Sequence, residues 1–148
     1  MRDLLGVDAA WGITAVRFMM GLLFAVHGYQ KFASGLGTVA GGFAKMSIPA
    51  PQVVGPLIAG LELIGGICLI IGLLTRLFGL LFMCEMIVTT VWIQIPTRGW
   101  NGSDLDRMLL AAGFLLLLAG PGRLAIDQLW LERALPERPV AARSVPHP

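Results

Sequence analysis

Four long apolar runs constrain this chain more than any other feature of its sequence. They cover residues 11–30, 53–74, 77–95 and 104–120 of the 148-residue chain. A helix needs about 20 mainly apolar residues to cross the hydrocarbon core of a bilayer. The first three runs meet this length, and only Thr75 and Arg76 separate the second from the third. The pattern predicts an all-α integral membrane protein in which these two runs form a tight antiparallel hairpin.

The last run is the shortest, and it begins like the N-terminus of a helix. Ser103 can cap it, and Asp104 and Asp106 would lie in its first turn, where the helix dipole favours negative charge. A helix over residues 104–120 would be about 25 Å long, enough for a thin or locally compressed bilayer. We therefore predict a four-transmembrane-helix bundle, with a re-entrant or interfacial helix as the alternative for the last run.

Composition agrees with a membrane location. Hydrophobic residues make up 56% of the chain, and charged residues make up only 14%. Soluble domains average about 25% charged residues. The chain is therefore expected to have the lipid bilayer as its main partner, and no nucleic-acid partner is expected.

The basic residues that flank the runs predict the orientation of the chain. One side of the membrane would carry Arg2, Arg76, Arg123, Arg133, Arg138 and Arg143, and the other side Lys31, Lys45, Arg98 and Arg107. Loops rich in Lys and Arg stay in the cytoplasm. We therefore predict that both termini are cytoplasmic.

The chain after the last run contains two further segments. Residues 123–134 alternate apolar and charged side chains at helical spacing, which is typical of a C-terminal interfacial amphipathic helix. Residues 136–148 contain four prolines and are predicted to form a disordered cytoplasmic tail. Residues 1–135 would then make up a single membrane domain.

Ionisable residues inside the runs are the first candidates for a functional site. Arg17, His27, Glu62 and Glu85 lie within them. A charge in hydrocarbon is costly unless it is paired or hydrated, so such residues face the bundle interior or a water-filled cavity. Counting the rise per residue puts Arg17 and Glu85 in the inner half of the membrane or near its midplane. We predict a structural ion pair between these two residues.

A second polar group is predicted nearer the outer surface. Glu62 would lie near the midplane, with His27, Lys31, Gln94 and Arg107 above it, so the sequence predicts an outward-facing polar cavity. His27 and Glu62 are the catalytic candidates, because histidine exchanges protons near neutral pH and the glutamate would accept or relay them. Lys31, Arg107 and Gln94 are the candidates for binding a substrate or anion. The alternative is that these side chains only fix helix register or, for Lys31 and Arg107, extend to lipid headgroups.

The usual catalytic and metal-binding signatures are absent from the sequence. Cys68 and Cys84 stand in adjacent runs and form no Cys-x-x-Cys pair, so buried reduced thiols are expected, although their similar depth allows a disulfide. Outside the tail, His27 is the only histidine. No metal site is therefore expected.

Short motifs in a fixed order resemble the DoxX family. They are Arg17-Phe18-Met19-Met20-Gly21, His27-Gly28-Tyr29-Gln30-Lys31, Ile48-Pro49-Ala50-Pro51, Glu62-Leu63-Ile64-Gly65-Gly66, Gly72-Leu73-Leu74-Thr75-Arg76 and Gly120-Pro121-Gly122-Arg123-Leu124-Ala125-Ile126-Asp127. The family commonly reads Arg-x-x-x-Gly, His-Gly-x-x-Lys, Glu-x-x-Gly-Gly and Gly-Pro-Gly-Arg-x-Ser-x-Asp at the matching places. The resemblance covers residues 12–130, and Ala125 departs from the family's usual Ser.

The resemblance implies a four-helix, multi-pass protein of the bacterial inner membrane. Relatives include DoxD-type subunits of thiosulfate:quinone oxidoreductases, and members are tied to membrane assemblies that handle thiol and oxidative stress. The chain would be at most a subunit of such an oxidoreductase, and quinone is the one cofactor left open. His27, Lys31 and Glu62, followed by Arg17, are the matching residues most expected to matter.

Three functions remain open at this point. The first is a redox-linked membrane subunit that binds a quinone or a sulfur compound in the outward cavity. The second is a non-catalytic scaffold for soluble or membrane redox partner proteins. The third is a small-solute transporter, for which a homo-oligomer would supply further helices.

Overall fold

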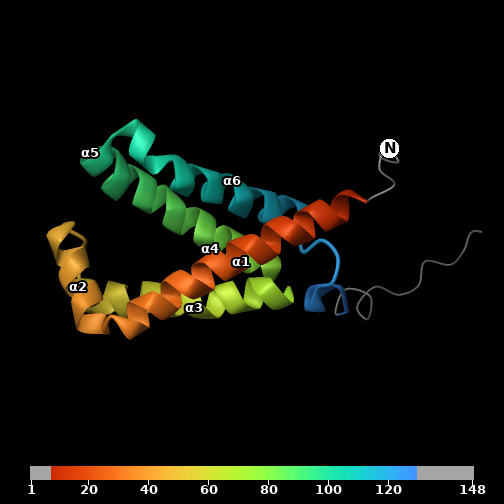
Figure 1. Cartoon of the computed structure of the whole chain (residues 1–148), viewed down its shortest axis with the longest axis horizontal. Coiled ribbons are helices and arrows are strands. Elements are labelled where there is room, and N and C mark those ends of the chain that lie inside the picture. Colours follow the sequence, from red (N-terminus) through yellow and green to blue (C-terminus); the bar gives the residue numbers. More distant parts are fainter. Residues whose placement is uncertain (1–7, 130–148) are drawn as a thin grey trace, which may run out of the picture.

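The computed structural model describes residues 8–129, and within them every regular element is a helix (Figure 1). The α-helices are α1 (Ala9–Ala33), α2 (Leu36–Lys45), α3 (Pro51–Ile71), α4 (Thr75–Val88), α5 (Ile95–Arg98) and α6 (Asp104–Ala119). A π-helix, η1 (Thr89–Gln94), joins α4 to α5, and a 3-10 helix, η2 (Trp100–Ser103), precedes α6. The predicted all-α class is confirmed for this part of the chain.

Three helical stretches in the described residues are long and apolar enough to cross a membrane. They are Ala9–Ala33, Pro51–Ile71 and Thr75–Arg98, and they correspond to the first three predicted runs. The third stretch combines α4, η1 and α5 into one long helical segment. The remaining helix, α6, has 16 residues, so a fourth span stays a prediction.

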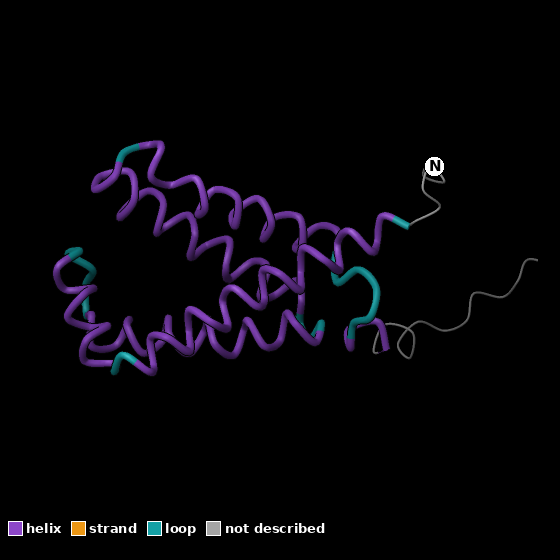
Figure 2. The backbone as a smooth tube through the Cα atoms, in the orientation of Figure 1, coloured by secondary structure: helices purple, strands orange, loops and turns teal. Residues whose placement is uncertain are grey.

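The long helices are arranged as two antiparallel pairs. α1 packs mainly against α3, and α4 packs mainly against α6. The pairs meet near the short turn between α3 and α4, and they diverge toward the end that carries α2 and α5 (Figures 1 and 2). We call the two ends the joined end and the open end. The contact between the two helix pairs therefore varies more along the length of the molecule than it does in a closed four-helix bundle.

Glycines explain why the helices pair in this way. A Cβ added to Gly21 would lie 2.7 Å from the Gly66 carbonyl oxygen, and one added to Gly66 would lie 2.3 Å from the Ala25 backbone nitrogen. In the other pair, a Cβ on Gly113 would lie 2.9 Å from the Gly79 carbonyl oxygen. Small residues let membrane helices approach closely, and these positions bring the paired backbones almost into contact.

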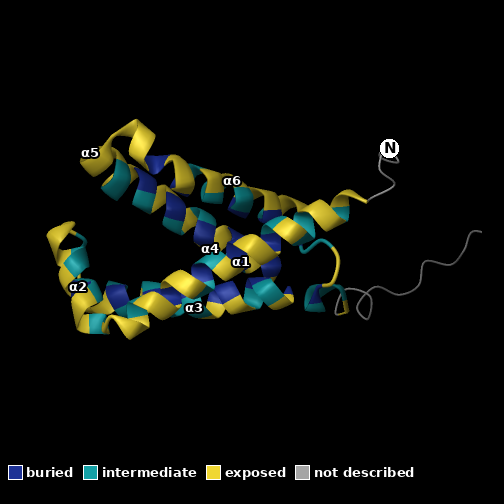
Figure 3. Cartoon of the chain, viewed as in Figure 1, coloured by how far each residue is buried: buried dark blue, intermediate teal, exposed yellow. Residues whose placement is uncertain are grey.

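A small apolar core joins the two pairs. Phe24 of α1 stacks on Phe82 of α4, with ring centroids 3.7 Å apart, and Leu69 and Leu116 are fully buried beside them. Figure 3 shows buried residues along the facing sides of the helices and exposed residues on their outer sides. Large apolar side chains cover that outer surface, as expected where helices face lipid.

The segment after α6 folds back and ties the helix ends together at the joined end. The Arg17 guanidinium donates hydrogen bonds to the carbonyls of Pro121 (2.5 Å) and Leu124 (2.9 Å). The Asp127 carboxylate accepts hydrogen bonds from the backbone nitrogens of Leu74 (2.7 Å) and Thr75 (2.8 Å), so it caps the start of α4. We call residues 120–127 the return loop.

The return loop corrects two predictions. The Arg17–Glu85 ion pair does not form, because both terminal nitrogens of Arg17 are occupied by carbonyls of the return loop. The predicted interfacial helix does not begin at residue 123, since residues 123–125 are not helical and helical turns start at Ile126. The rest of that helix, residues 130–134, and the predicted tail, residues 136–148, lie outside the described residues.

Candidate functional site

An ion pair between α1 and α3 forms the centre of the candidate site. Lys31, in the last turn of α1, pairs through Nζ with Oε1 of Glu62 from the middle of α3. The Glu62 side chain is only 5% exposed, whereas that of Lys31 is 26% exposed. Sequence analysis placed both residues at one cavity, and the structure brings them into direct contact.

Close helix packing holds this pair in place. Gly28 lies one turn before Lys31, and a Cβ there would lie 2.3 Å from the backbone nitrogen of Leu63, the residue after Glu62. The two backbones therefore also approach closely beside the ion pair. The Gly residue of the His-Gly-x-x-Lys motif thus has a direct role in positioning Lys31.

Glu85 of α4, which belongs to the other helix pair, lies next to this ion pair. Its carboxyl group lies beside that of Glu62, within hydrogen-bonding reach, and the positive charge of the Lys31 ammonium also acts on the Glu85 carboxyl. Within residues 8–129, Oε2 of Glu62 and Oε2 of Glu85 are both buried and have no donor among the protein groups. Two carboxylates in contact repel each other unless a proton lies between them. One shared proton would remove this repulsion and leave the three side chains electrically neutral. We call Lys31, Glu62 and Glu85 the carboxyl cluster.

A π-helix follows Glu85 directly. Thr89, its first residue, donates a side-chain hydrogen bond to the Glu85 carbonyl (2.9 Å). Thr90 is 6% exposed, and its hydroxyl has no partner within the described residues. π-Helical turns are rare and occur frequently at functional sites. Sequence analysis missed Thr90, although two adjacent threonines in an apolar run were a visible signal.

A second buried acid lies at the start of α6. Asp106 is 8% exposed, and its Oδ2 has no partner in the described part of the chain. Gln94 and Arg98 lie close to its carboxyl group. Gln94 is thus located beside an acidic residue, not beside Lys31. Asp106 was read from the sequence only as a first-turn acid that stabilises the helix.

The other predicted site residues lie apart from the carboxyl cluster. Arg107 pairs with Asp104, donates a hydrogen bond to the Trp100 carbonyl (2.6 Å) and lies over the Trp100 ring. His27 is exposed on α1, one turn before Lys31. The four residues predicted to line one cavity with Glu62 therefore occupy four different places.

His27 lines an open groove between α1 and α6. The groove has a volume of about 610 Å³, and its other lining residues are apolar: Ala15, Val16, Met19, Met20, Leu22, Leu23, Val26, Leu109 and Ala112. It therefore differs from the predicted polar cavity in its lining. It follows the apolar side of α1 and ends at His27, so its polar end lies close to the carboxyl cluster.

Both cysteines are free in the structure. Cys68 is partly buried and Cys84 is exposed. The expectation of reduced thiols agrees with this state, but the expectation that both are buried is wrong for Cys84.

The DoxX family model matches residues 12–95, which is more than half of the chain. The chain belongs to the DoxX family. All three residues of the carboxyl cluster fall within the matched segment, whereas Asp106 and the return loop lie beyond it. No solved structure matches this DoxX protein.

Curated relatives of this DoxX protein come from several bacteria. It is 34% identical to "Putative oxidoreductase CatD" of Bacillus subtilis over 116 residues, which cover 78% of this chain and 84% of that protein. It is 28% identical to an uncharacterized membrane protein of Mycobacterium tuberculosis, with 88% of each chain covered. It is 31% identical to inner membrane protein YqjF of Escherichia coli, with 80% of this chain and 91% of that protein covered. Together with the apolar helices, these relatives establish it as a membrane protein.

Proposed function

We propose that this DoxX protein is a redox-linked membrane subunit that binds a quinone. The observation that carries this proposal is the open apolar groove that ends at His27, one helical turn from Lys31 and the carboxyl cluster. A quinone has a polar ring and a long apolar chain, and this groove offers a matching polar end and apolar length. The name of the relative CatD agrees with a redox role.

The residues around the groove have distinct roles in this proposal. The apolar side chains of α1 and α6 would hold the isoprenoid chain, and His27 would hydrogen-bond a ring oxygen. A bound quinone supplies two-electron, two-proton redox chemistry. The carboxyl cluster would hold one exchangeable proton at Oε2 of Glu62 or of Glu85. Electrons would come from a soluble or membrane redox partner protein.

An anionic sulfur compound fits the site less well than a quinone. The charge of Lys31 is balanced by Glu62, and that of Arg107 is balanced by Asp104. The candidate residues thus offer no uncompensated cation beside the groove in the described part of the chain. We therefore favour the lipophilic ligand among the two redox alternatives.

The remaining features of the proposal concern the membrane. We propose that the protein lies in the bacterial inner membrane with both termini in the cytoplasm, and that α6 is the fourth span. The joined end would then face the cytoplasm, and the open end would face outward. The basic residues of the flanks support this orientation.

Quinone binding by purified protein in nanodiscs tests the proposal. The probe is a ubiquinone that carries an isoprenoid chain, and the readout is the quinone retained per protein after lipid exchange. His27→Ala should weaken binding about 2- to 10-fold, the value of one hydrogen bond. Ala112→Trp, which fills the groove, should abolish it.

Leu118→Trp is the matched control for the groove variant. It adds the same side chain on the same helix, at a position that is 62% exposed and does not line the groove. It should bind quinone like the wild type. Wild-type binding by Ala112→Trp, or no binding by the wild-type protein, would refute the proposal and leave the scaffold as the better hypothesis.

A further inference from the structure

A row of buried polar groups leads from the carboxyl cluster to the start of α6. Three of its oxygens have no hydrogen-bond partner within residues 8–129: Oε2 of Glu85, Oγ1 of Thr90 and Oδ2 of Asp106. Leaving a buried polar atom unpaired costs about 1–3 kcal/mol. Ordered water commonly supplies the missing partners of such groups. Several such atoms in succession indicate a hydrated path and not an isolated packing defect.

Charge and chain position relate the members of this row to one another. Asp106 is close enough for its charge to act on Glu85, although the two residues belong to different helices. Thr90 lies between Glu85 and Gln94 on the same helical segment, and Gln94 lies beside Asp106. The π-helix, whose hydrogen bonds join residues five apart, is the local feature that carries Thr90 and Gln94.

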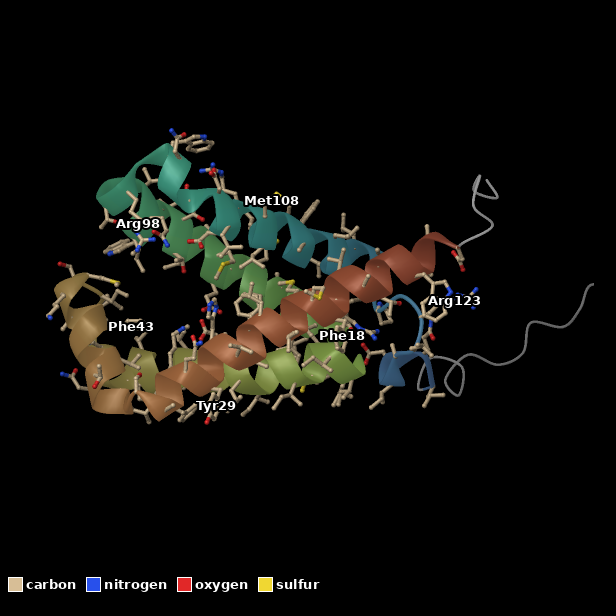
Figure 4. All side chains as sticks on the ribbon, viewed as in Figure 1. Phe18, Tyr29, Phe43, Arg98, Met108 and Arg123 are labelled. Carbon is tan, nitrogen blue, oxygen red and sulfur yellow. The ribbon has the colours of Figure 1, made fainter. Side chains whose placement is uncertain are left out.

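The row leads toward the open end of the molecule. Asp106 is in the first turn of α6, and Arg98, an exposed residue at the end of α5, lies near its carboxyl group. Figure 4 shows Arg98 at the open end, where the two helix pairs have diverged. Between the pairs, the stacked Phe24 and Phe82 and their apolar neighbours separate this row from the joined end, where two other buried atoms, Nε of Arg17 and Oγ1 of Thr75, lack a partner in the described residues.

We propose that Asp106 and Thr90, with intervening water, conduct protons between the open-end surface and the carboxyl cluster. A proton passes from water at the surface to the Asp106 carboxylate, and from there through water and the Thr90 hydroxyl to Glu85. Each step breaks one O–H bond and forms another, and no electron moves. Arg98 and Gln94 face Asp106, Lys31 and Glu62 face Glu85, and Arg107 is held by Asp104 in the same turn as Asp106.

The proton route extends the proposed function. It rests on that function only for the reason that protons are moved, and not for the path that they take. A quinone reaction at His27 requires exchange of protons with one side of the membrane, and the carboxyl cluster is the nearest proton-holding group. The path itself consists of residues of this chain and requires no bound quinone. A test on quinone-free protein therefore separates failure of the route from failure of quinone binding.

Infrared spectroscopy of quinone-free protein in nanodiscs tests the route. The carbonyl stretch of the protonated carboxyl is assigned by its loss in Glu85→Gln, and its shift is followed in time after transfer to deuterated buffer. Asp106→Asn should slow the exchange by about 10²-fold, which is typical for loss of a positioned proton-transfer group. Thr90→Val should also slow it, and Asp106→Glu should restore it.

Asp104→Asn is the matched control. It makes the same chemical change in the same turn of α6, at a side chain that is 73% exposed and outside the row, so exchange should stay at the wild-type rate. Helix content by circular dichroism and elution volume in size-exclusion chromatography show whether each variant is folded. If Asp106→Asn does not fold, Thr90→Val, which alters no charge, decides the test. Wild-type exchange rates in Thr90→Val and Asp106→Asn, or no protonated carboxyl band in the wild type, would overturn the proposal.

Discussion

The contact between α1 and α3 predicts that an added methyl group at Gly66 is strongly destabilising. In Gly66→Ala the new Cβ would lie 2.3 Å from the Ala25 backbone nitrogen and 2.7 Å from the Gly21 carbonyl oxygen. Ordinary contact begins at 3.4 Å, so the helices must separate by about 1 Å, a gap that forfeits a quarter to a half of each van der Waals contact. Backbone atoms cannot rotate away as a side chain does. We expect a loss of about 3 kcal/mol in the free energy of unfolding, the upper end of the usual range for overpacking.

Gly60→Ala on the same helix is the control for this prediction. A Cβ at Gly60 meets nothing within 4 Å, so the substitution should stabilise α3 by about 0.5–1 kcal/mol through its higher helix propensity. Both variants can be compared by reversible unfolding in mixed detergent micelles, followed by helix content. Equal effects of the two substitutions would refute the argument that backbone contact at Gly66 holds the pair together.

Three further predictions concern the two ends of the molecule. Arg17→Lys replaces a guanidinium that donates to two carbonyls, so the free energy of unfolding should fall by about 1.5–3 kcal/mol; an unchanged value would show that the return loop does not need Arg17. Asp127→Asn replaces one of the two accepting oxygens of the cap on α4 by an amide group that cannot accept, so it should cost about 1 kcal/mol in the same assay; an unchanged value would show that one accepting oxygen is enough. Lys31→Met leaves Glu62 without its counter-charge and should cost up to about 3 kcal/mol, and adding Glu62→Gln should recover most of that loss. A double variant no more stable than Lys31→Met would contradict the ion pair's role.

Hydropathy and motif order predicted the helical class, the first three long helices and the family. These features depend on local composition, and each apolar run carries its own signal. The fourth span received a weaker prediction, because α6 is short and its length alone does not distinguish a spanning helix from an interfacial one.

The carboxyl cluster was only partly predictable. Lys31 and Glu62 were placed together, but Glu85 was assigned to Arg17 because both were counted from an assumed inner edge. Counting from the turn between α3 and α4 would have done better, since Glu62 lies nine residues before Ile71 and Glu85 lies ten residues after Thr75. Residues at equal distances from a hairpin turn lie at similar depth, so the sequence did hold the signal.

Other parts of the site depend on tertiary structure that no local pattern reveals. Arg17 finds its partners in main-chain carbonyls of the return loop, and every residue carries such a group, so no side-chain pattern marks them. The π-helix at Thr89–Gln94 likewise contains no charged residue and no hydrophobic periodicity that would indicate it in the sequence. Gln94 and Arg107 were grouped by depth alone, and the structure separates them because their helices face different neighbours.

The return loop has a consequence for the order in which the chain is made. Arg17 enters the membrane with α1, but the carbonyl of Pro121 that accepts its hydrogen bond follows 104 residues later in the chain. During synthesis the ribosome must therefore deliver α3, α4 and α6 before this guanidinium gains its native partners, and an Arg near a helix centre costs about 2.5–3.5 kcal/mol on insertion scales. Until then the first helix is a poorly anchored intermediate, and a nascent chain halted before residue 121 should be more exposed to membrane proteases than the finished protein.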